Sequence, residues 1–140
     1  MTRSLSISGK GTLPRDFYTS KTESMWDERP RFENPDYNRL WFNDCDLTEI
    51  PNLLQNIKDL YCYNCKNLTF LPKDAPKLVN LVLYNCPKIQ SLPQGWTKLT
   101  KIEIKYCDAL VAIPPSYKRL EWIDCHDCKN LTKLPSYLPK

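Results

Sequence analysis

The stretch from Leu78 to Pro93 reads LVNLVLYNCPKIQSLP and contains the pattern on which the fold depends. It corresponds to L-x-x-L-x-L-x-x-C-x-x-L-x-x-[LI]-P, where an isoleucine fills the fourth leucine position. Leu81 and Leu83 stand two residues apart, which indicates a short β-strand with one buried face, because side chains alternate along a strand. A unit this short buries its apolar face only against a neighbouring copy.

The same unit recurs through most of the chain. Successive cysteines are 20, 21, 21 and 21 residues apart, at Cys45, Cys65, Cys86, Cys107 and Cys128. Prolines recur every 21 residues, at Pro51, Pro72, Pro93, Pro114 and Pro135. Two apolar columns share this register, Leu40/Leu60/Leu81/Ile102/Ile123 and Phe42/Cys62/Leu83/Ile104/Cys125. Five tandem copies cover residues 38–140, so the sequence predicts a repeat solenoid.

The unit resembles the leucine-rich repeat, L-x-x-L-x-L-x-x-[NC]-x-L in its usual form, with one residue more before the next leucine here. Its 21-residue length and Leu-Pro pair are most similar to repeats of bacterial effectors. Cysteine in the asparagine position is similar to repeat proteins of large DNA viruses. The resemblance implies a curved parallel β-sheet whose concave face binds another macromolecule.

The columns also predict how each coil is built. The strands stack into a parallel sheet, with neighbours about 4.8 Å apart. A proline in every return removes a backbone donor and fixes φ, so the returns are expected to be extended or polyproline-like and non-helical. The cysteine column falls where the chain leaves the strand and turns inward. A buried thiol there fills space and donates weakly to nearby carbonyl groups.

Residues 1–37 precede the repeats and lack their pattern, which predicts an N-terminal arm followed by a cap. We expect residues 1–20 to form the arm and the aromatic stretch from Trp26 to Tyr37 to form the N-cap. The fifth repeat ends at Lys140. Either residues 137–139 fold across the last coil, or that end contacts a partner or a second copy.

Composition limits the classes of partner and compartment. A formal charge of +4 over 140 residues is mild and does not point to nucleic acid. No apolar run is long enough for a membrane span, and the N-terminus lacks the apolar run of a signal peptide. We therefore expect an intracellular, reducing compartment with the cysteines as thiols, or a virion.

The strand positions that flank the core columns are expected to face outward from the concave sheet. Candidate partner-binding residues are the aromatic, apolar and charged side chains at these positions, namely Trp41, Tyr61, Tyr63, Val82, Tyr84, Lys105, Trp122 and His126. Aromatic residues dominate binding hot spots. They also favour strands and stack across neighbouring strands, so each one taken alone has a structural explanation.

Cysteine chemistry is the strongest enzymatic or metal-binding alternative. The C-x-x-C pairs Cys62/Cys65 and Cys125/Cys128 suggest zinc or redox chemistry, but all four positions belong to repeat columns. The pairs are three coils apart, about 14 Å, too far to share one zinc ion. His126 should point outward while its neighbouring cysteines point inward, which disfavours a Cys–His nucleophile. We expect no metal site and no cofactor.

These observations predict a non-catalytic module that binds another protein through the concave face. The alternative is a structural subunit of a large assembly, such as a minor capsid component, held by its N-terminal arm and open C-terminal end. Bacterial effectors with similar repeats carry a ligase domain after the solenoid. Because nothing follows Lys140 in this sequence, the chain itself is expected to lack enzymatic activity.

Overall fold

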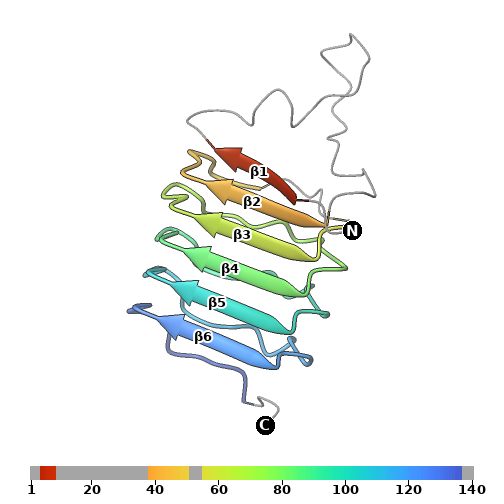
Figure 1. Cartoon of the computed structure of the whole chain (residues 1–140). Coiled ribbons are helices and arrows are strands. Elements are labelled where there is room, and N and C mark those ends of the chain that lie inside the picture. Colours follow the sequence, from red (N-terminus) through yellow and green to blue (C-terminus); the bar gives the residue numbers. More distant parts are fainter. Residues whose placement is uncertain (1–3, 9–37, 51–54, 137–140) are drawn as a thin grey trace.

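The protein is a single-sheet solenoid of stacked coils (Figure 1). The computed structural model describes residues 4–8, 38–50 and 55–136. Its parallel sheet has six strands in sequence order. They are β1 (Ser4–Ser8), β2 (Arg39–Asn43), β3 (Asp59–Tyr63), β4 (Asn80–Tyr84), β5 (Lys101–Lys105) and β6 (Trp122–His126). The described coils contain no helix, as expected for returns with a proline in each repeat.

The strand register confirms the repeat alignment. From β2 to β6 the residues of each predicted column pair directly, for example Leu60 with Leu81 and Leu81 with Ile102. In β2 and β3 the second and fourth residues are buried and the other three are half-buried, as period-two alternation requires. The core is therefore a stack of equivalent layers in which neighbouring coils bury each other's apolar residues.

One strand is not predicted by the repeat pattern. β1 lies within residues 1–20, the segment assigned to an arm, and pairs in parallel with β2. Its register places Leu5 beside Leu40 and Ile7 beside Phe42, in line with the two core columns. Deleting residues 1–20 would therefore remove a strand of the sheet. The predicted N-cap, Trp26 to Tyr37, and the closing residues 137–139 lie outside the described residues.

Two large aromatic side chains fill the returns. Trp96 is completely buried and its Nε1 donates to the carbonyl oxygen of Pro72 at 3.0 Å. Tyr117, one repeat later, is 1% exposed and its hydroxyl donates to the Pro93 oxygen at 2.5 Å. Burial raises the pKa of Tyr117. Each aromatic ring thus ties its own return to the Leu-Pro segment of the preceding coil.

The described part of the chain contains no helix that could cross a lipid bilayer.

Candidate binding face

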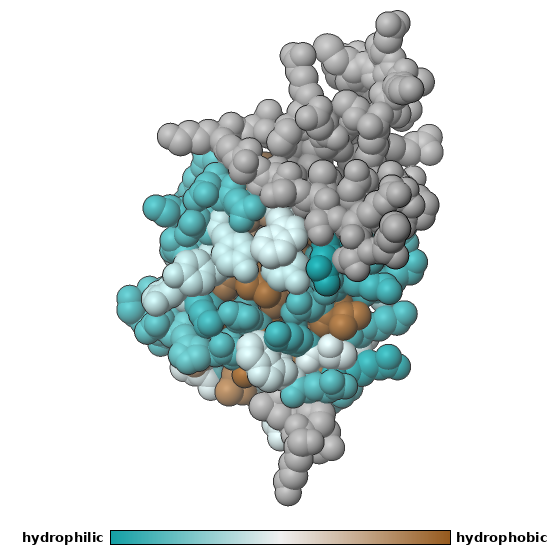
Figure 2. Space-filling view, in the orientation of Figure 1, coloured by the Kyte–Doolittle hydropathy of each residue, from teal (hydrophilic) through white to brown (hydrophobic). Residues whose placement is uncertain are grey.

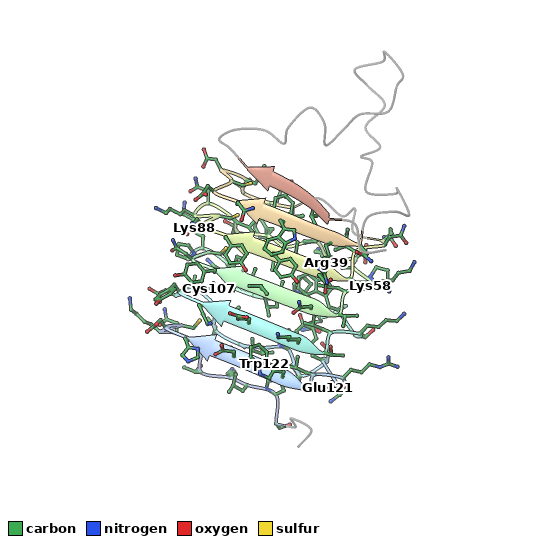
Figure 3. The ribbon with its side chains drawn as sticks, viewed as in Figure 1. Arg39, Lys58, Lys88, Cys107, Glu121 and Trp122 are labelled. Atoms are coloured by element: carbon green, nitrogen blue, oxygen red, sulfur yellow. The ribbon has the colours of Figure 1, made fainter. Side chains whose placement is uncertain are left out.

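One side of the sheet carries the core and the other is the open face, which we define by the first, third and fifth residues of strands β2 to β6. Figure 3 shows Arg39 and Trp122 on strands at opposite ends of this face. In the same view Lys58 and Glu121 lie where strands begin, and Cys107 lies beyond the end of β5. In Figure 2, side chains of intermediate hydropathy gather on this face over its upper strands.

Five aromatic rings form a continuous series on and beside the open face, which we call the aromatic ladder. Trp41 and Tyr61 stack with ring centroids 3.9 Å apart and planes 9° apart. Trp41 also stacks with Tyr63 at 5.8 Å, and Tyr63 meets Tyr84 at 6.0 Å with a 35° tilt. Tyr84 meets Tyr106 edge to face at 5.3 Å and 74°. The ladder crosses four neighbouring coils, so the aromatic residues predicted for β2 to β4 are indeed brought together.

The geometry of the rings determines which parts of the aromatic ladder are accessible to a partner. Rings 3.9 Å apart leave no room for a third ring between them, so Trp41 and Tyr61 cover one another's inner faces. The hydroxyl of Tyr61 accepts a hydrogen bond from Nδ2 of Asn80 at 3.2 Å. At the other end Tyr84 and Tyr106 are 38% and 46% exposed. The ladder is thus tightly packed at Trp41 and most accessible at Tyr106.

Tyr106 is the site residue that the sequence analysis missed. It belongs to the exit row, the residue after each strand, which has positive φ in every described repeat: Asp44, Asn64, Asn85, Tyr106 and Asp127. Asp and Asn tolerate this left-handed conformation, whereas for other residues with a Cβ it costs about 1–2 kcal/mol. Tyr106 adopts it with φ of 56°. An aromatic residue in an otherwise Asp/Asn column was the signal available in the sequence.

Val82 does not have the exposure predicted for a binding residue. It occupies the expected third position of β4 on the open face, between Tyr61 and Glu103 in the register. Its exposed fraction is only 6%, and both of its register neighbours carry larger side chains. Val82 therefore supports the packing of the face and offers little surface to a partner.

The C-terminal part of the open face is charged. Nζ of Lys105 lies 2.8 Å from Glu103 Oε1 and 3.3 Å from Asp124 Oδ2. Hydrogen bonding to Glu103, and secondarily to Asp124, raises the pKa of Lys105. The other oxygen of Asp124 contacts Nδ1 of His126. Lys105 and His126 are thus both where the sequence placed them and are joined through Asp124.

Two further cations on this face have partners. The Arg39 Nε donates to Asp59 Oδ2 at 2.8 Å across β2 and β3. Nζ of Lys101 lies 4.5 Å from the centroid of the Trp122 ring, a cation–π contact. Trp122 is 41% exposed, as expected for a residue at the rim of the sheet.

The cysteine column points into the core, which confirms the sequence prediction. Cys65, Cys86, Cys107 and Cys128 each lie between two carbonyl oxygens, one in the same coil and one in the preceding coil. For Cys65 these are Tyr63 at 3.5 Å and Phe42 at 3.7 Å. The thiol therefore supplies a weak donor where the strand ends and its carbonyls leave the sheet.

The C-x-x-C pairs occupy repeat columns. Cys62 and Cys65 are at most 1% exposed, and Cys125 and Cys128 are half-buried in the last coil. The register places Cys62 and Cys125 three strands apart. Burial raises the pKa of Cys62 and holds that of Cys125 at about 12. Within residues 38–50 and 55–136, no three His, Cys, Asp or Glu side chains are grouped to hold a metal ion.

Thiol accessibility tests this arrangement. At pH 8, we expect the native protein to expose at most Cys125 and Cys128 to an aromatic disulfide reagent, and both should react slowly because their thiols are largely protonated. All seven cysteines should react rapidly in concentrated urea. Spectrophotometric counting of modified thiols over time measures both stages. Rapid modification of three or more thiols before unfolding would contradict a buried cysteine column.

The two cysteines nearest to His126 in the sequence do not share its side of the strand. His126 is exposed on the open face and contacts Asp124, whereas Cys125 and Cys128 pack against the core. The outward position of His126 agrees with the sequence prediction and places its ring on the opposite side of the strand from the Cys125 thiol.

Comparison with known proteins found no matching family model, no matching curated protein and no matching solved structure.

Proposed function

We propose that this chain is a non-catalytic module that binds another protein through the open face of its sheet. The observation that carries the proposal is the aromatic ladder, five rings from four neighbouring coils on and beside a face that no other described element covers. Tyr and Trp present large, rigid contact areas with a polar group and dominate the binding energy of protein interfaces. The resemblance of the repeat to leucine-rich repeats supports the same proposal.

Packing within the sheet explains only part of the ladder. Each aromatic pair stabilises a sheet by about 0.5–1.5 kcal/mol beyond its buried area, which accounts for the tight stack of Trp41 and Tyr61. Tyr84 and Tyr106 also form a favourable edge-to-face pair, but each stays more than a third exposed, so this contact leaves part of both rings uncovered. Their surface is the part of the ladder best suited to a partner.

Selection from a random peptide library displayed on phage tests the proposal. We expect peptides enriched on the immobilised protein to lose at least about tenfold in affinity for the double variant Tyr63→Ala/Tyr84→Ala, since hot-spot aromatics contribute about 2 kcal/mol or more each. The matched control is Phe70→Ala, an aromatic residue that is 65% exposed and lies in a return outside the open face. This control should bind the same peptides as the unmodified chain.

The same experiment distinguishes the binding-face proposal from a second candidate function. A structural subunit of a large assembly, such as a virion component, would bind through its ends. The half-buried apolar residues of the last coil, together with Leu134 at 54% exposure, give that candidate its support. A subunit of this kind should tolerate the double substitution. Peptides that bind the double variant as tightly as the unmodified chain would therefore overturn the binding-face proposal.

A further inference from the structure

Charge is distributed unevenly between the binding face and the rest of the molecule. The whole chain has a formal charge of +4. The open face and exit row together carry three basic residues against five acidic ones: Arg39, Lys101 and Lys105 against Asp44, Asp59, Glu103, Asp124 and Asp127. The aromatic ladder thus stands on the acidic side of a basic protein. Complementary charge guides the encounter with a partner and excludes partners of like charge, so this face favours a basic one.

The face already holds cations in two ways. Lys101 lies over the ring of Trp122, and Lys105 bridges the carboxylates of Glu103 and Asp124. Aromatic rings and carboxylates in adjacent positions of the same sheet are therefore able to bind positively charged side chains. These contacts are intramolecular examples of the chemistry that the accessible end of the ladder offers to a partner.

An aromatic ring face is available at the Tyr106 end of the ladder. In an edge-to-face pair one ring directs its edge at the other, so both faces of the edge-on ring are free of that neighbour. Tyr84 and Tyr106 form such a pair, at 74°, and they are 38% and 46% exposed. The next coil is directly adjacent, because the Tyr106 amide donates to the His126 oxygen at 3.1 Å. The exposed Asp127 follows in the exit row, one coil from Tyr106.

We propose that the segment bound by the open face carries an arginine side chain, which packs on the Tyr84/Tyr106 pair and is charge-paired by Asp127, one coil away in the exit row. This inference rests on the proposed function and specifies the chemistry of the partner. A guanidinium group is planar, so it stacks on an aromatic ring while its edge donates to carboxylates. The ammonium group of lysine is compact and strongly hydrated, and it does not satisfy both contacts equally well.

Two synthetic probes of equal charge, a nona-arginine and a nona-lysine peptide labelled with a fluorophore, test the proposal by anisotropy at physiological ionic strength. We expect the full chain to bind the arginine probe about fivefold more tightly than the lysine probe, the ratio of a modest cation–π advantage. The variant Tyr106→Asn should bind both probes with equal affinity. Tyr106→Phe, which keeps the ring, should retain the preference.

Unfolding of the Tyr106→Asn variant would not explain a lost preference for the arginine probe, because this variant is expected to fold. Asn64 and Asn85 occupy the same exit-row position with φ of 56° and 54°, so asparagine is better suited to residue 106 than tyrosine is. The relief of strain at positive φ should offset the loss of the edge contact with Tyr84, so we expect Tyr106→Asn to keep the thermal midpoint within about 3 °C while it abolishes the arginine preference. Equal affinities of the unmodified chain for both probes, or an arginine preference that survives Tyr106→Asn, would overturn the proposal.

The phage selection keeps the two proposals distinguishable. If its peptides depend on Tyr63 and Tyr84 but the chain shows no arginine preference, the binding face stands and the arginine inference fails. If no selected peptide depends on those two residues, the binding face itself is wrong and the arginine inference fails with it.

Discussion

Replacement of Trp96 by alanine should lower the free energy of unfolding by about 3–5 kcal/mol, the range for deletion of a large buried aromatic side chain. Trp96 has no exposed surface and belongs to the continuous core of the solenoid. Its Nε1 also donates to the Pro72 oxygen at 3.0 Å, which links two coils. Alanine would leave a cavity and remove the donor of a buried carbonyl group, and both effects reduce stability.

Urea denaturation followed by circular dichroism measures this loss, and two variants separate its causes. Trp96→Phe keeps an aromatic ring but loses the donor, so we expect an intermediate loss of about 1–3 kcal/mol. Trp122→Ala removes the same residue type from a position that is 41% exposed, so its cost should stay below about 1 kcal/mol. Similar losses for Trp96→Ala and Trp122→Ala would show that the returns are not part of the core.

The second prediction compares how much unfolding free energy is lost when either of two isoleucines of one column is replaced by alanine. Ile102 in β5 is completely buried between β4 and β6, whereas Ile123 in β6 is only half-buried and has a described neighbour on one side. In a solenoid, stability is the sum of terms within coils and between nearest neighbours. We expect Ile102→Ala to lower the free energy of unfolding by about 3–4 kcal/mol and Ile123→Ala to lower it by about 1 kcal/mol.

Equilibrium unfolding of both variants under identical conditions gives the comparison. The two substitutions delete the same atoms from the same register position, so a difference reports the number of packed neighbours alone. Equal losses would mean that the last coil is covered as fully as the central one. Since residues 137–140 are outside the described structure, this pair of variants also tests whether the end of the solenoid is covered.

The candidate site was largely predictable from the repeat register. Trp41, Tyr61, Tyr63 and Tyr84 fall at outward positions of the pattern, and the structure places them side by side. Val82 satisfied the same rule but is buried, because its exposure depends on the sizes of its neighbours. The period-two alternation of a strand specifies the side of the sheet on which a residue lies and contains no information about how much of it neighbouring side chains cover.

Tyr106 and β1 were missed for related reasons. Tyr106 lies just beyond its strand at a position of positive φ, and its ring meets that of Tyr84 edge to face. The stretch from Ser4 to Ser8 alternates serine with Leu5 and Ile7, a signal for a strand, but it stands outside the 21-residue period. Its pairing with β2 joins residues about 35 positions apart, which local patterns do not reveal.

The sequence alone determined the solenoid, its register, the inward cysteines and the outward aromatic residues of β2 to β4. These follow from the repeat because a solenoid packs each coil only on its neighbours, so one-dimensional periodicity maps directly onto the columns of the sheet. The tertiary structure decided the ring angles of the ladder, the burial of Val82, the contact of Tyr106 with Tyr84 and the addition of β1. Each of these depends on the shapes and distances of side chains or strands from different coils, which the period does not specify.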